Sequence, residues 1–150
     1  MSERDIVEAC EAMNRIAGAF RRRASERLRP FGITLAQYEL ISHLRRRGAL
    51  APSQAAEGLD WDRPTMAVVS SACRKAGWLV RSRQVQDRRS ALIELSGRGE
   101  ELLDRVEATK PFAISSFGDP FDVVGTEERA LMLRLLDRVA RRSGDLWGRF

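Results

Sequence analysis

The chain has 150 residues, a length that fits one domain, or a binding lobe and a dimerisation lobe that share a core. No apolar run approaches the length of a membrane span, and the charged start does not resemble a signal peptide. Two well-separated cysteines argue against a disulfide framework and fit a reducing cytoplasm. We therefore expect neither a membrane protein nor a disulfide-rich secreted one.

The formal net charge of +5 suggests a polyanionic partner, and nearly all of the basic residues are arginines. The excess is uneven along the chain. Residues 31–95 contain ten basic and six acidic side chains, whereas residues 96–150 contain nine and ten. Positive charge therefore gathers in the central part of the chain.

Residues 3–29 have the pattern of one long amphipathic helix, which Pro30 and Gly32 should end. Its apolar residues keep mostly to one face: Ile6, Ala9, Cys10, Met13, Ile16, Ala17, Phe20 and Leu28. A lone helix of this kind owes most of its stability to packing, so this face should meet a partner surface.

A second helix is expected over residues 35–47, with Thr34 as its N-cap. Tyr38, Leu40, Ile41 and Leu44 should point inward, and we interpret the three arginines at 45–47 as favourable charges at the negative end of the helix dipole. The only histidine, His43, has no companion ligand at a suitable spacing, so we expect no metal site there.

The next two helices form a helix-turn-helix pattern. The first covers residues 52–59, where Pro52 suits a first turn and Gly58 should loosen the end. The second runs from the N-cap Asp62 to Ala76, and Gly77 supplies the left-handed position that closes it. Met66, Val69, Cys73 and Ala76 recur at helical spacing and should form its buried stripe.

A hairpin should follow this second helix, because apolar and polar residues alternate over 78–83 and again over 91–95 around a charged tip. At the tip, the carboxylate of Asp87 could orient Arg89 toward a narrow DNA minor groove. The alternative is that the hairpin arginines are simply solvated. We favour DNA binding because the hairpin directly follows a helix-turn-helix, which places one helix in the major groove.

The candidate DNA-binding residues share an outward position on this helix-turn-helix or its hairpin. They are Ser53, Gln54, Arg63, Pro64, Thr65, Ala67, Val68, Ser71, Arg74, Arg81, Arg83, Asp87, Arg88 and Arg89. Ser53 and Gln54 should lie near the DNA backbone, and residues 63–71 should face the base edges. Apolar Ala67 and Val68 could contact thymine methyl groups. Recognition of the DNA sequence would then depend more on Arg63, the hairpin and DNA shape.

The C-terminal part should be helical as well. Ser96 caps a helix that begins at Gly97, Pro111 should break it, residues 118–122 form a loop, and Thr126 caps a last helix. These segments carry little polar chemistry. The whole chain also lacks a Ser/His/Asp arrangement, a glycine-rich phosphate loop and a metal-ligand spacing, so we expect no enzyme and no cofactor.

The central part of the chain resembles the MarR family of bacterial transcription regulators. The segments that carry the resemblance are, in order, Ile33–Tyr38, Gly48–Leu50, Ser53–Ala56, Leu59, Asp62–Thr65, Gly77–Arg81, Asp87–Arg89 and Leu95–Gly99. The most specific part is the Asp-Arg-Arg tip followed by Leu-Ser-x-x-Gly. Three residues depart from the usual pattern: Ala51 at a common cap position, Pro64, and Val68 where a polar residue is expected.

The resemblance implies a mainly α (α+β) winged helix-turn-helix protein. Residues 33–96 would form the DNA-binding lobe, and residues 1–30 and 97–150 would supply dimerisation helices. Such a cytoplasmic, nucleoid-associated homodimer would bind a near-palindromic operator on double-stranded DNA, most often as a repressor that a small molecule releases. A winged-helix module that binds proteins remains the alternative class.

The resemblance also places an effector in a cleft between the two lobes, where Phe20, Phe31, Tyr38 and Val106 are candidates for binding an aromatic or phenolic molecule. Plain core packing is the alternative for each of them. His43 is a polar helix residue or, second, part of that pocket. Some relatives sense oxidants through an N-terminal cysteine, which makes Cys10 a further alternative, whereas Cys73 should be a small core residue.

Overall fold

The computed structural model describes the backbone of residues 2–84 and 87–147, and the side chains of residues 2–82 and 91–146. Its elements are α1 (Glu3–Leu28), the 3-10 helix η1 (Arg29–Phe31), α2 (Leu35–Arg47), α3 (Pro52–Leu59), α4 (Arg63–Lys75), β1 (Leu79–Gln84), β2 (Asp87–Leu95), α5 (Gly97–Ala108), α6 (Ile114–Phe117) and α7 (Thr126–Trp147). The fold is mainly helical with one two-stranded antiparallel sheet, as the sequence predicts.

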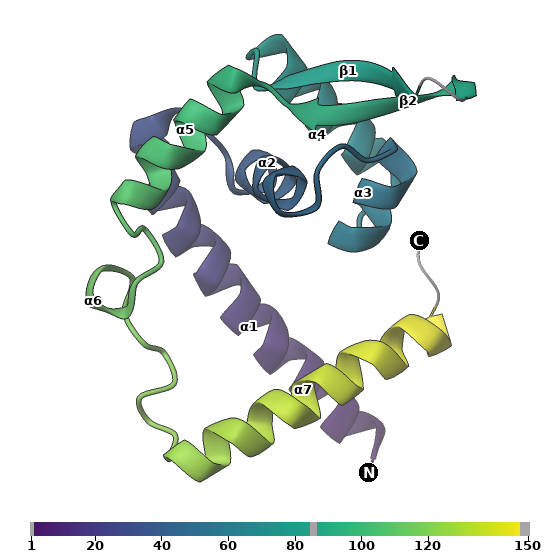
Figure 1. The fold of residues 1–150 in the computed structure, drawn as a ribbon. Helices are drawn as coiled ribbons and strands as arrows, with labels where there is room; N and C mark the ends of the chain where they lie inside the picture. Colours follow the sequence, from purple (N-terminus) through teal and green to yellow (C-terminus); the bar gives the residue numbers. More distant parts are fainter. Residues whose placement is uncertain (1, 85–86, 148–150) are drawn as a thin grey trace.

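The elements form two parts (Figure 1). Helices α2, α3 and α4 gather beneath the β1–β2 hairpin, while α1 runs obliquely away from them and α7 crosses the N-terminal half of α1. Helix α5 connects the hairpin to this second part. The arrangement separates a compact winged-helix lobe from two long helical arms.

The hydrophobic core lies around α2, because this helix packs against α1, α3, α4 and α5. Its largest fully buried side chains are Leu28, Leu40, Ile41, Leu44, Cys73, Leu102, Leu103 and Val106. Leu50 forms a short antiparallel bridge with Ile93, in which the Leu50 N–H donates to the Ile93 carbonyl at 3.0 Å. This bridge fixes the hairpin to the start of α3. The core thus holds the helix-turn-helix and the hairpin as one unit.

Local capping chemistry sets most helix boundaries where the sequence predicts them. The Thr34 hydroxyl accepts the Gln37 N–H at 3.2 Å, and the Gln37 side chain accepts the Thr34 N–H at 3.0 Å, forming a capping box. Helix α5 ends at Ala108, and Lys110 adopts a left-handed φ of 46° immediately before Pro111. No helix in the described part of the chain is long and apolar enough to cross a membrane.

The start of α7 differs from the prediction, since Thr126 is its first helical residue and not its cap. The Gly125 carbonyl accepts the Arg129 N–H at 2.8 Å, and the Glu128 carboxylate accepts the Gly125 N–H at 3.0 Å. The helix therefore begins one residue earlier than predicted, because the Gly125 carbonyl accepts the first intrahelical bond and a glutamate in the first turn binds the Gly125 N–H.

Candidate nucleic-acid interface

The start of α4 is fixed by Asp62, as the sequence predicts. Its carboxylate accepts the Thr65 N–H at 2.7 Å, and hydrogen bonds from the Thr65 hydroxyl and N–H lower the pKa of Asp62. Pro64 lies in the first turn, where its missing N–H removes no helical bond. On the inner side, Met66 and Cys73 are almost completely buried and hold the helix against the core.

The outer face of α4 is open. Arg63, Pro64, Thr65, Ala67 and Val68 are all exposed, and Val68 retains 69% of its surface. Arg74 is exposed near the end of the helix, whereas Ser71 is half-buried and presents less surface than the sequence prediction requires. An exposed N-terminal half on a helix with a buried back is the geometry by which recognition helices meet base edges.

Helix α3 begins after its N-cap Ala51, which lacks the side-chain acceptor that a serine or threonine cap would supply. The Gln54 side-chain oxygen accepts the Ala51 N–H at 3.0 Å, so this residue supports the helix start besides being exposed. Ser53 is exposed beside it. Asp60, at a left-handed φ of 55°, then turns the chain toward α4. Ser53 and Gln54, which the sequence predicts to lie near the DNA backbone, are therefore both exposed in the first turn of α3.

The turn from α4 into the hairpin depends on Gly77. This residue has a φ of 80°, and the Trp78 N–H bonds to the Cys73 carbonyl while the Gly77 N–H bonds to the Arg74 carbonyl, both at 3.0 Å. These two bonds form a Schellman motif, which needs glycine at this position. The hairpin therefore leaves α4 in a fixed direction.

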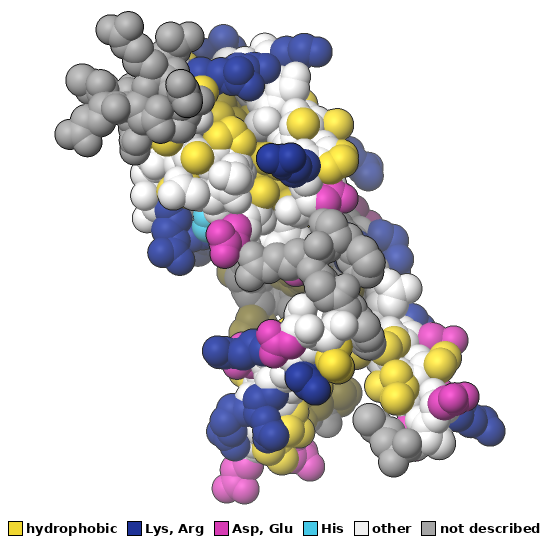
Figure 2. Space-filling model, turned by 90° about the vertical axis from the view of Figure 1, so that its right-hand side faces the viewer, with side chains coloured by type: hydrophobic (Ala, Val, Ile, Leu, Met, Phe, Trp, Pro, Cys, Tyr) yellow, Lys and Arg dark blue, Asp and Glu magenta, His cyan; other side chains and the backbone are white. Residues whose placement is uncertain are grey.

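Strands β1 and β2 pair antiparallel from Leu79 opposite Leu95 onward, with an irregularity between Arg83 and Gln84. Arg81 is exposed on β1. The side chains of the other predicted hairpin residues, Arg83, Asp87, Arg88 and Arg89, lie outside those that the structure describes. Figure 2 shows Lys and Arg side chains and exposed hydrophobic ones interspersed on both the upper and the lower part of the molecule.

Comparisons with known proteins agree with this geometry. Residues 33–91 match the model of the MarR family. A helix-turn-helix transcriptional regulator of Bacillus cereus, named as uncharacterized, is 28% identical over 120 residues, covering 80% of this chain and 78% of that protein. The helix-turn-helix transcriptional regulator PecS of Dickeya dadantii is 29% identical over 114 residues, covering 74% and 67%.

Among solved structures, a mutant of MarR from E. coli complexed with operator DNA matches this fold with a TM-score of 0.80 at 19% identity, over 90% of this chain and 95% of that one. The segment from residue 33 to residue 91 is thus similar to the MarR family, and the chain shares the fold of that solved structure. The curated relatives that it matches are named as transcriptional regulators. Within the part of the chain that the structure describes, no group of three His, Cys, Asp or Glu residues is placed to hold a metal ion.

The effector residues suggested by the resemblance to the MarR family are only partly brought together. The rings of Phe20 and Tyr38 both approach Phe112, with centroids 6.5 and 5.4 Å apart, and Phe31 is a half-buried neighbour of the core. Val106 is completely buried among core side chains, which agrees with the core packing that is the alternative for this residue.

Phe117 completes this aromatic cluster, 5.4 Å from Phe20 and 5.7 Å from Phe112. The prediction from the sequence did not include Phe112 and Phe117 among these aromatic residues. The helix break at Pro111 was the available signal, since it turns the chain back so that the aromatic residues after it face α1.

The two cysteines of this chain lie in different environments. Cys10 is exposed and lines the groove between α1 and α7. Cys73 is completely buried, and burial raises the pKa of its thiol to about 12. A thiol so protonated is a poor nucleophile, which agrees with the predicted role of Cys73 as a core residue.

Proposed function

We propose that this chain is a homodimeric MarR-family transcriptional regulator that binds a near-palindromic operator, most often as a repressor. The observation that carries the proposal is the open N-terminal half of α4, whose back is held in the core by Met66 and Cys73. A helix fixed in this way can enter the major groove without rearrangement of the lobe.

The chemistry of the α4 face suggests how bases are read. Arg63 is exposed at the first position of the helix and can donate two hydrogen bonds to a guanine. Ala67 and Val68 offer apolar surface to thymine methyl groups, and the tip at Asp87–Arg89 would enter the flanking minor groove. Ser53 and Gln54 would lie along the phosphates.

A dimer is part of the proposal because the arms, residues 1–30 and 97–150, leave large apolar side chains uncovered. Phe20, Leu131 and Leu133 keep 46%, 49% and 64% of their surface exposed. Contiguous apolar surface of this kind marks an interface. Two-fold symmetry would then place the half-sites one helical turn apart, about 10 base pairs from centre to centre.

Relatives support this function. MarR of E. coli is described in complex with operator DNA, and PecS is named as a transcriptional regulator. A small-molecule effector would act by changing the distance between the two α4 helices, which shifts a conformational population and needs no chemistry. Regulation of transcription would place the protein with the chromosome in the bacterial cytoplasm.

The proposal is tested by fluorescence anisotropy with DNA from upstream of the protein's own gene, across a salt series. We expect specific binding that exceeds a scrambled duplex and weakens steeply with salt. Arg63→Ala should lower the affinity by about tenfold, because a bidentate base contact contributes roughly 1–3 kcal/mol.

The matched control is Arg4→Ala, which removes the same charge from an exposed residue that pairs with Glu8 at the start of α1. This variant should bind nearly as well as the wild type. Equal losses of DNA affinity in both variants would show that Arg63 contributes only its positive charge. Weak, sequence-blind binding by the wild type would instead favour a protein partner.

A further inference from the structure

The outer face of α4 offers few hydrogen-bonding side chains to a base edge. Between Arg63 and Arg74, the helix has no charged residue, no asparagine and no glutamine. These are the residue types that form bidentate hydrogen bonds with guanine or adenine, or that accept a hydrogen bond from cytosine. Hydrogen-bond recognition by α4 is therefore restricted to the two arginines near its ends and to a few hydroxyl groups.

Two of these hydroxyl groups already donate within the protein. The Thr65 hydroxyl hydrogen-bonds to the Asp62 carboxylate, and the Ser70 hydroxyl donates to the Ala67 carbonyl at 3.4 Å. A hydroxyl has a single proton to donate, so both groups can only accept a further hydrogen bond. Ser71 is half-buried and presents less surface. The polar side chains of this face therefore leave most of base recognition to other contacts.

Three aliphatic side chains, Pro64, Ala67 and Val68, are exposed together on this face. Because Ala67 and Val68 lie three and four residues after Pro64, both are its neighbours on the helix surface. Val68 keeps 69% of its surface exposed. Val80, the other exposed large hydrophobic residue in the described part of residues 33–96, keeps 43%. The middle of the outer face of α4 is thus an aliphatic patch.

Neither the core nor the helix itself accounts for Val68. Met66 and Cys73 hold the other side of α4 in the core, so Val68 adds nothing to that packing. Valine also forms helices less well than alanine, because branching at Cβ restricts its side chain against the preceding turn. An exposed valine at this position therefore points to a contact outside the chain, on the face that α4 would turn toward DNA.

The major groove offers an aliphatic side chain one kind of apolar group. This group is the C5-methyl of thymine, since the other groups on the base edges are hydrogen-bond donors and acceptors. The base 5-methylcytosine carries the same methyl group at the same ring position. Thymine and 5-methylcytosine differ in the polar group beside that methyl. A side chain without donors or acceptors therefore binds both bases in the same way.

We propose that Val68 is a specificity-determining residue that recognises a pyrimidine by its C5-methyl group, and that 5-methylcytosine is bound as well as thymine at that position. The inference rests on the proposed function, because it needs α4 in the major groove. It extends that function, because methylation of a cytosine at the contacted position would raise the affinity of the regulator for its site. Cytosine methylation is then a signal that α4 reads directly.

The first measurement compares two duplexes of the region upstream of the protein's own gene, one with thymine and one with uracil in its place. Uracil keeps the pairing and the minor-groove groups of thymine and lacks only the methyl. Anisotropy titrations should show weaker binding to the uracil duplex, by about fourfold for one buried methyl and by roughly fifteenfold for one in each half-site. This ratio should stay constant across a salt series, because a methyl contact releases no counterions.

Two variants assign the effect to Val68. Val68→Ala removes two methyl groups, and Val68→Thr replaces one of them with a hydroxyl at similar volume. In both variants the ratio of affinities for the thymine and uracil duplexes should fall toward one. Ile114→Ala is the matched control, because it truncates a residue on α6 that is 70% exposed, and it should keep the wild-type ratio. An unchanged ratio in both Val68 variants would overturn the role of this residue.

Replacement of one thymine at a time by uracil then locates the contacted base. At that position, duplexes with thymine, uracil, 5-methylcytosine or cytosine, each opposite its complementary purine, separate the methyl group from the base pair. We expect tight binding to thymine and 5-methylcytosine and weaker binding to uracil and cytosine.

The outcomes separate this inference from the proposed function. Specific binding that is equal for thymine and uracil, or equally weak for cytosine and 5-methylcytosine, would overturn recognition by the methyl group and leave the proposed function standing. Absence of specific binding by the wild type to any upstream duplex would overturn the proposed function, and this inference with it.

Discussion

At the scale of single residues, His43 is a titratable side chain that folding removes almost completely from water. It is 7% exposed, and its ring lies where any side chain at Gly58 would collide. Burial lowers the pKa of the imidazole below its usual 6.5, and the charges of Arg46 and Arg47 lower it further. The folded protein therefore holds this ring neutral at neutral pH.

This predicts an acid-sensitive contribution to stability. Between the lowered pKa of the folded state and the unfolded value near 6.5, the unfolded chain binds more protons, so the free energy of unfolding falls as the pH falls through this window. Urea titrations at pH 7.5, 6.5 and 5.5 should show this decline. His43→Gln should have a shallower pH dependence, because it keeps a polar side chain without the titration. Parallel curves for the two proteins would refute the prediction.

At the scale of elements, Arg45 joins α2 to α5. Its guanidinium contacts Glu100 at 3.1 Å and Glu107 at 3.2 Å, and it also bonds to Asp104. These three carboxylates lie on successive turns of one helix face. The sequence predicts that Arg45, Arg46 and Arg47 all stabilise the negative end of the helix dipole. The structure gives Arg45 a separate role, because it pairs with a helix more than fifty residues away in the sequence.

Loss of this contact should loosen the junction between the lobe and the arms. Arg45→Gln removes the shared cation and leaves three carboxylates repelling one another. We expect the free energy of unfolding to fall by about 1 kcal/mol at low salt, and by less at high salt, since partly exposed ion pairs are screened. Urea denaturation at two ionic strengths measures both effects. Arg47→Gln, on the same turn, should change little, and equal effects in the two variants would contradict the role of Arg45.

The helices and the hairpin could be predicted because their boundaries depend on neighbours in the sequence. Thr34, Asp62 and Ser96 each accept a backbone N–H three residues on, and Gly77 adopts the left-handed turn. The last helix begins one residue earlier than the sequence predicts, because the Gly125 carbonyl accepts the Arg129 N–H and includes Thr126 in the helix.

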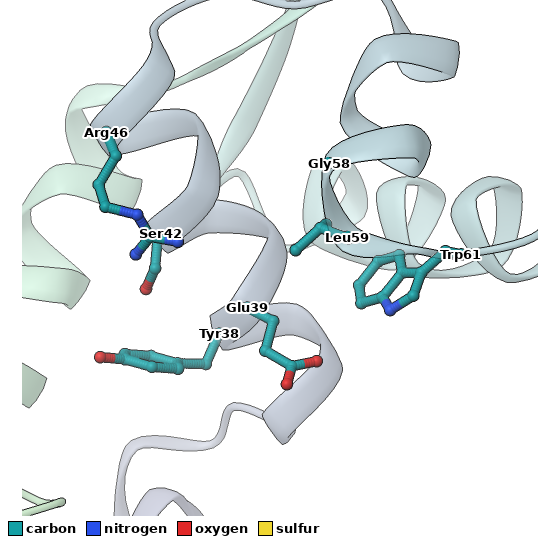
Figure 3. A pocket seen from close by; sticks show the side chains of 7 residues that line it. All are labelled: Tyr38, Glu39, Ser42, Arg46, Gly58, Leu59 and Trp61. Atoms are coloured by element: carbon teal, nitrogen blue, oxygen red, sulfur yellow. The ribbon is translucent and has the colours of Figure 1, made fainter. Parts of the chain in front are cut away.

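The candidate sites were predictable only where they lie on one exposed helix. The outer face of α4 follows from the spacing of Met66 and Cys73, but the partial burial of Ser71 does not. The sequence predicts that Gly58 loosens the end of α3. The structure shows instead that the His43 ring leaves no room for a side chain at this position. The sequence does not predict the cavity between α2 and the turn after α3 either (Figure 3), because it forms only when segments that are separate in the sequence pack together.

At the scale of the whole molecule, the two helical arms leave apolar side chains uncovered. A groove of about 800 Å³ runs between α1 and α7 and is lined mostly by apolar side chains: Ile6, Ala9, Cys10, Ala12, Met13, Val123, Val124, Glu128, Leu131, Met132, Leu135, Leu136, Val139 and Ser143. Helices α1 and α7 meet near the N-terminal half of α1 and leave these faces open (Figure 1). A second copy of the chain is the partner that two-fold DNA recognition requires.

Two variants separate this interface from the DNA-binding face. Leu131→Glu places a charge in the groove on α7, where glutamate still favours the helix, and should shift the mass measured by sedimentation equilibrium from twice 16.9 kDa to a single chain. DNA affinity should fall with it, because the two half-sites would no longer be bound together. Val68→Glu places the same charge on the exposed face of α4, so it should abolish DNA binding while the dimer persists. A wild type that is monomeric at tens of micromolar, or a Leu131→Glu protein that stays dimeric, would show that the arms do not form the interface.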